Sequence, residues 1–124
     1  MYARERSLAS WNIAVALVAL AVGTWFGPLQ ALEHAGVNLY DSAGGGVAYY
    51  QGLSIHGVFN ALVWTTFFII GFFTLTVTYG LQRPLVAPGL NVAGFVLMVV
   101  GTVLTAAALL TNNASVLYTF YPPM

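Results

Sequence analysis

The sequence predicts an all-α membrane protein with three transmembrane helices, and two observations lead to this fold class. First, 60% of its 124 residues are hydrophobic and only 5% are charged, with a mean hydropathy of +0.86. A soluble globular domain carries about 25% charged residues, so this chain could not cover a water-facing surface. Second, the few charges bound long uncharged runs, and a helix needs about 20 apolar residues to cross the hydrocarbon core.

Composition also excludes several classes of function. The chain has no cysteine, which rules out disulfides, thiolate metal sites and cysteine nucleophiles. Its net charge is zero, which leaves no basic patch for nucleic acid. Neither an internal repeat nor a soluble domain is evident, so residues 1–124 form a single set of transmembrane segments in a lipid bilayer.

The first helix is expected over about residues 8–28, inside the uncharged run 7–32. Trp11 and Trp25 lie near its two ends, as interfacial aromatic residues do. Gly27-Pro28 is expected to break or kink it. A basic start before an apolar run also fits a secretory signal peptide, but this run is longer than a typical signal segment and lacks a clean cleavage site.

Residues 33–48 are expected to form a loop, because they show no apolar periodicity and contain three consecutive glycines, Gly44 to Gly46. No lysine follows these glycines, so a nucleotide-binding loop is not supported. We expect His34, at the start of this loop, to be a solvated residue and not a metal ligand.

The second helix is expected over about residues 50–79 and the third over about 90–110. A turn separates them, marked by Pro84, Pro88 and neighbouring glycines. All three arginines fall on one side of the membrane in this arrangement, with Glu33 and Asp41 on the other. The positive-inside rule therefore places the N-terminus in the cytoplasm and the C-terminal end outside.

The second helix carries His56 about two turns from its start, inside a run with no charge between Asp41 and Arg83. An ionisable side chain within the membrane is costly and is a candidate functional residue. Neutral imidazole is also a common ligand of haem iron. We therefore expect His56 to be an axial haem ligand; the alternative is a packed histidine bonded to a neighbouring carbonyl.

Two residues lie one turn either side of His56 on the same helix face, Gly52 and Asn60. Small residues beside a ligand let a flat macrocycle or a partner helix approach the backbone. These two residues are therefore candidate haem surroundings, with ordinary helix packing as the alternative for the glycine.

Three stretches together resemble a known family. They are Phe26-Gly27-Pro28-Leu29-Gln30-Ala31-Leu32, then Tyr49-Tyr50-Gln51-Gly52-Leu53-Ser54-Ile55-His56-Gly57-Val58-Phe59-Asn60-Ala61, and Ala114-Ser115-Val116-Leu117-Tyr118-Thr119-Phe120-Tyr121-Pro122-Pro123. In order and spacing they resemble the N-terminal part of subunit I of the B-type haem–copper cytochrome c oxidases. The resemblance covers nearly the whole chain but only about the first quarter of such a subunit.

The resemblance implies a role for several residues. It makes His56 an axial ligand of a low-spin haem, b-type by expectation, and it places Tyr118 near the haem–copper centre. The alternative for Tyr118 is an interfacial aromatic anchor. The resemblance also implies cytochrome c oxidation, reduction of oxygen to water and coupled proton transport in the cell membrane.

The family's high-spin haem and copper need further histidines, and this chain has only two. No catalytic residue is therefore expected in this segment, and we expect an incomplete N-terminal part of a larger helix bundle. Its expected partners are the remainder of subunit I, other oxidase subunits and a cytochrome c-like electron donor. Two other readings stay open: a nitric-oxide-reductase-like member of the same superfamily, and a small non-catalytic membrane packing subunit.

Overall fold

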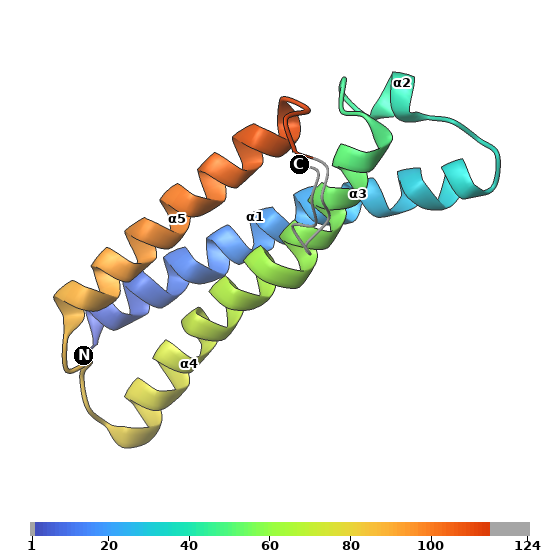
Figure 1. The fold of residues 1–124 in the computed structure, drawn as a ribbon. Helices are drawn as coiled ribbons and strands as arrows, with labels where there is room; N and C mark the ends of the chain where they lie inside the picture. The colour runs from blue at the N-terminus through green and yellow to red at the C-terminus, as the bar shows by residue number, and fades with distance from the viewer. Residues whose placement is uncertain (1, 115–124) are drawn as a thin grey trace.

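The computed structural model describes residues 2–114. This part of the chain contains three helices long and apolar enough to cross a membrane, at Ala3–His34, Tyr49–Leu81 and Pro88–Leu110 (Figure 1). The predicted all-α membrane fold is confirmed.

Helix α1 (Ala3–His34) is longer than the expected segment 8–28. Of the expected break or kink at Gly27-Pro28, the break is wrong, because the helix continues through Pro28. Proline removes one backbone hydrogen bond, but membrane helices tolerate it where neighbouring helices satisfy the freed groups. His34 is consequently the last residue of the helix rather than a loop residue, although it is exposed as expected.

The second span is one continuous helix in three sections, α3 (Tyr49–Gly57), the π-helix η1 (Val58–Trp64) and α4 (Thr65–Leu81). The π-helical section begins two residues after His56. Such sections are rare and occur often at functional sites. A short helix, α2 (Tyr40–Ala43), interrupts the expected loop between the first two spans.

The first two spans pack antiparallel along most of their length (Figure 1). The two spans approach each other closely at Gly71 of α4, where a Cβ would stand 2.9 Å from Ile13 Cγ1 and 3.0 Å from the carbonyl oxygen of Ala9. Small side chains of α1 and larger apolar side chains of the second span belong to one buried cluster. Its members include Ala16, Ala19, Val58, Phe59, Val63 and Phe67.

Helix α5 (Pro88–Leu110) begins on a proline, whose missing N–H costs nothing at a helix start. It runs beside the other two spans (Figure 1), and its Phe95 ring meets the Phe67 ring edge-on at 6.1 Å. Only 6% of its most apolar stretch is buried, against 33% for α1. Beyond its end, the Asn112 side chain accepts from Ala48 N–H (3.1 Å) and donates to the carbonyl of Gly46 (3.2 Å).

Candidate functional site

His56 lies in the last turn of α3, half-buried against α1. Its ring faces Gly27, where a Cβ would stand 2.9 Å from Cε1 and 3.2 Å from Nδ1. Its Nδ1 lies 2.9 Å from the carbonyl oxygen of Gly23, one turn earlier on α1. The imidazole of α3 therefore packs against α1, and its Nδ1 is hydrogen-bonded to the α1 backbone.

This anchor determines which nitrogen of His56 carries the proton. A carbonyl oxygen only accepts hydrogen bonds, so the bond to Gly23 requires the proton on Nδ1. In the neutral imidazole, Nε2 then keeps its lone pair. Among the residues that the structure describes, no side chain or backbone group hydrogen-bonds to Nε2. The imidazole thus presents one free, unprotonated nitrogen, which is the form that binds a metal.

Two glycines of α1 that contact this ring were not among the residues predicted from the sequence. Gly23 and Gly27 are four residues apart in a membrane helix, a spacing known for close helix packing. That spacing in Gly23-Thr24-Trp25-Phe26-Gly27 was the available signal, and it predicts an approach by another helix. It does not identify His56 as the residue that approaches.

Asn60 lies next to His56 as predicted, although in the π-helical section rather than in a regular helix. Its side-chain amide nitrogen, Nδ2, lies 3.2 Å from His56 Nδ1. It also faces Gly23, where a Cβ would stand 2.8 Å from Asn60 Cγ. The structure therefore gathers four residues, Gly23, Gly27, His56 and Asn60, which we call the His56 cluster.

Gly52 is one turn before His56 but lies outside this cluster. A Cβ there would meet the Tyr40 hydroxyl at 2.5 Å and Phe26 Cδ1 at 2.9 Å. Gly52 thus makes room for Tyr40 beyond the membrane-spanning part of α1, and its role beside a haem stays a prediction. Tyr118 lies outside the described residues, and its role also stays a prediction.

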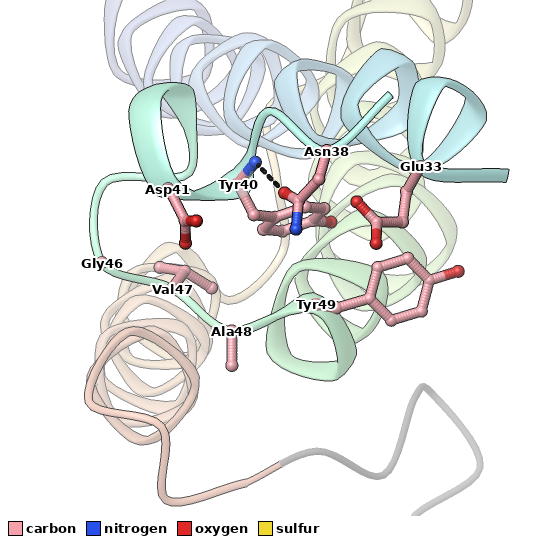
Figure 2. Close-up of a pocket in the computed structure, with 8 residues that line it drawn as sticks. All are labelled: Glu33, Asn38, Tyr40, Asp41, Gly46, Val47, Ala48 and Tyr49. Atoms are coloured by element: carbon pink, nitrogen blue, oxygen red, sulfur yellow. Dashed lines mark hydrogen bonds between the residues drawn. The ribbon is translucent and has the colours of Figure 1, made fainter. Parts of the chain in front are cut away.

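A separate cavity of about 400 Å³ lies between α2 and the start of α3 (Figure 2). The side chains around it include the carboxylates of Glu33 and Asp41. Burial raises the pKa of Tyr40 above its ordinary value, since the phenolate would lose hydration there. In the described part of the chain no three histidine or acidic side chains gather to hold a metal ion, in this cavity or elsewhere.

The His56 cluster fits one ligand position of a haem. Metal-bound histidines almost always donate their other ring N–H to a carbonyl, a carboxylate or water, and the Nδ1 bond to Gly23 is of this kind. His34 differs: it is exposed, and its Nε2 lies 3.4 Å from the Tyr49 hydroxyl. Of the two histidines, His56 alone is anchored by Nδ1 with Nε2 open.

Comparison with known proteins identifies the family to which this chain is similar. The model of the family described as cytochrome c and quinol oxidase polypeptide I matches residues 7–124. The chain is also 37% identical over 125 residues to cytochrome c oxidase subunit 1 of Thermus thermophilus. That match covers 97% of this chain but 22% of the relative, so the chain spans about a fifth of the relative's length. The two matches confirm the resemblance to subunit I that the three motifs indicated.

Proposed function

The chain belongs to the cytochrome c and quinol oxidase polypeptide I family, and from this premise we propose that it forms part of the catalytic subunit of a respiratory terminal oxidase. Within that subunit, His56 supplies one axial ligand to a low-spin haem of b type. The remainder of the subunit supplies the second axial ligand, the high-spin haem and the copper. The name of the Thermus relative favours this oxidase function over nitric oxide reduction.

The observation that carries the proposal is the 2.9 Å contact between His56 Nδ1 and the carbonyl of Gly23. It leaves Nε2 unprotonated without any change of ring orientation. A packed histidine with no ligand would gain from a second hydrogen bond through Nε2, because an unpaired polar atom within a membrane is costly. Within residues 2–114, His56 forms no such second bond through Nε2.

Two residues of α1 then act on the His56 ring. Gly27 leaves room for the ring against α1, and the carbonyl of Gly23 accepts the hydrogen bond from Nδ1. A haem with two histidine ligands is six-coordinate and supplies electron transfer, with a potential set by its ligands, their hydrogen bonds and burial. His56 thereby holds a site that relays electrons.

The proposed subunit oxidises a cytochrome c-like donor, reduces oxygen to water and couples this to proton transport. It lies in the cell membrane, where the arginines Arg4, Arg6 and Arg83 favour a cytoplasmic N-terminus. His56 is then close to the outer surface, where an external donor could deliver electrons.

The test compares His56→Ala with His34→Ala in the assembled, haem-loaded oxidase. We expect His56→Ala to lose the low-spin haem from the reduced-minus-oxidised optical spectrum. His34→Ala is the matched control, because it removes the chain's other histidine at an exposed helix end, and it should keep the native spectrum. Intact low-spin haem in His56→Ala would contradict the proposal.

A further inference from the structure

We propose that Asn60 is a positioning residue that, together with the carbonyl of Gly23, fixes the plane of the His56 imidazole and the electron density on its Nε2. This inference rests on the proposed function, because it concerns how the proposed ligand is held.

Two groups lie within hydrogen-bonding distance of one atom, His56 Nδ1. His56 Nδ1 lies 2.9 Å from the carbonyl oxygen of Gly23 and 3.2 Å from the amide of Asn60. These groups come from different elements, α1 and η1. Two contacts from different directions restrict rotation of the ring more than one contact does.

The Asn60 side chain reaches this position through the space that Gly23 leaves. Its amide occupies the space that a side chain at Gly23 would fill, and a Cβ there would also stand 3.0 Å from Phe59 Cβ. Gly23 therefore serves twice, since its carbonyl accepts the imidazole proton and its missing side chain admits Asn60. The π-helical turn that begins at Val58 is where Asn60 leaves regular α-helix geometry.

The proton on His56 Nδ1 decides which end of the Asn60 amide can bond to it. The bond to Gly23 requires a proton on Nδ1, and a protonated ring nitrogen cannot accept a hydrogen bond from an amide N–H. In the structure Asn60 Nδ2 faces Nδ1, and with a proton on Nδ1 this contact is attractive only when the amide oxygen faces Nδ1 instead. The nitrogen and oxygen ends of an amide are nearly alike in shape, so a half-turn about the Cβ–Cγ bond achieves this. Asn60 Oδ1, which is otherwise buried without a partner among the described residues, then accepts the proton beside Gly23.

The consequence is chemical. A hydrogen bond that withdraws the Nδ1 proton makes Nε2 more basic, and a more basic ligand favours the oxidised form of the bound metal. Asn60 thereby lowers the reduction potential of the haem that His56 binds. Loss of its acceptor should raise that potential.

A buried asparagine of α1, Asn12, makes a different hydrogen bond from that of Asn60. Asn12, with 1% exposure, donates to the carbonyl of Leu8 in its own helix at 2.9 Å. Asn60 shows no such bond to a carbonyl of its own helix among the described residues, and its amide meets a side chain instead. Asn12 is therefore the matched control, a buried amide of the same bundle that does not touch His56.

The experiment uses Asn60→Leu, Asn60→Asp and the control Asn12→Leu in the assembled, haem-loaded oxidase. The readouts are the midpoint potential of the low-spin haem and its electron paramagnetic resonance spectrum, which depends on the ligand-plane orientation. Asn60→Leu should retain the haem with a raised potential and shifted g-values. Asn60→Asp keeps the shape and a stronger acceptor and should lower the potential. Asn12→Leu should leave both readouts native.

The outcomes separate this inference from the proposed function. Native potential and g-values in both Asn60 variants, with low-spin haem lost in His56→Ala, would overturn the positioning role alone. Low-spin haem retained in His56→Ala would overturn the proposed function and with it this inference. If Asn60→Leu does not assemble, Asn60→Asp decides, because a native or raised potential in that isosteric variant overturns the positioning role.

Discussion

The His56 cluster and helix α5 are two regions of one membrane chain that are built differently. In the His56 cluster each glycine meets a specific group of another helix, Gly23 at Asn60 and Gly27 at His56. On α5 no atom of another described element lies within 4 Å of where a Cβ would stand at Gly94 or Gly101. The same residue type therefore marks a fixed contact in one region and an open face in the other.

The difference follows from the solvent. Lipid tails are as apolar as leucine, so helices in a bilayer gain little from burying apolar surface and associate through close packing and polar contacts. The first two spans have both kinds of contact. Helix α5 is apolar around most of its circumference and exposes large side chains such as Leu90, Leu97 and Leu104. Its placement thus depends on fewer specific contacts.

The largest expected effect is that of Gly27→Ala. The new Cβ would stand 2.9 Å from His56 Cε1, so the ring must move away from Gly23 and lose the bond from Nδ1. Overpacking and a lost buried hydrogen bond each cost about 1–3 kcal/mol. We expect lost low-spin haem in the assembled oxidase, measured by optical spectroscopy. A native haem content would show that the ring does not depend on this glycine.

A smaller effect is expected for Gly71→Ala, which tests helix packing without touching His56. Its Cβ would meet the backbone carbonyl of Ala9 at 3.0 Å, and backbone cannot rotate away. We expect a loss of about 1–3 kcal/mol in the free energy of unfolding in detergent, with the haem spectrum unchanged. Native stability would mean that α1 and α4 are less closely fixed than the His56 cluster.

Outside the membrane-spanning helices, close packing also surrounds Tyr40, and there we expect the stability of the fold to depend on pH. Burial raises the pKa of Tyr40, so the folded state favours the neutral phenol. The stability that the neutral Tyr40 phenol contributes is complete below its pKa in the unfolded chain, about 10. It is lost as the pH rises through its higher pKa in the folded protein. We expect Tyr40→Phe to remove part of the loss of stability at alkaline pH. The measurement is the free energy of unfolding as a function of pH across that range. Tyr50→Phe is the control with which the effect of Tyr40→Phe is compared, since Tyr50 is a neighbouring tyrosine that is 66% exposed.

The smallest effect is expected on α5. Gly101→Ala adds a methyl group into open space, and alanine favours a helix over glycine by about 1 kcal/mol. The chain in detergent should be equally stable or slightly more stable. Marked destabilisation would contradict the open face and would place Gly101 in a close contact like that of Gly27.

The sequence predicted the three spans because charged residues cannot remain in lipid, and this constraint is local to each run. It also indicated His56 and Asn60, since polar residues in such runs are few. It failed at Pro28, where the helix continues because the tertiary context overrides a local breaking signal. The pairing of Gly23 with His56 and Asn60 depends on the relative rotation of two helices, which no local pattern determines. The π-helical turn after His56 likewise had no sequence signal that we recognised.

The most direct measurement is an experimental structure of the assembled, haem-loaded oxidase. The account predicts a haem iron bound to His56 Nε2, while Nδ1 keeps its hydrogen bond to the carbonyl of Gly23. A structure in which Nε2 hydrogen-bonds to another side chain, or in which every haem is held without His56, would contradict it.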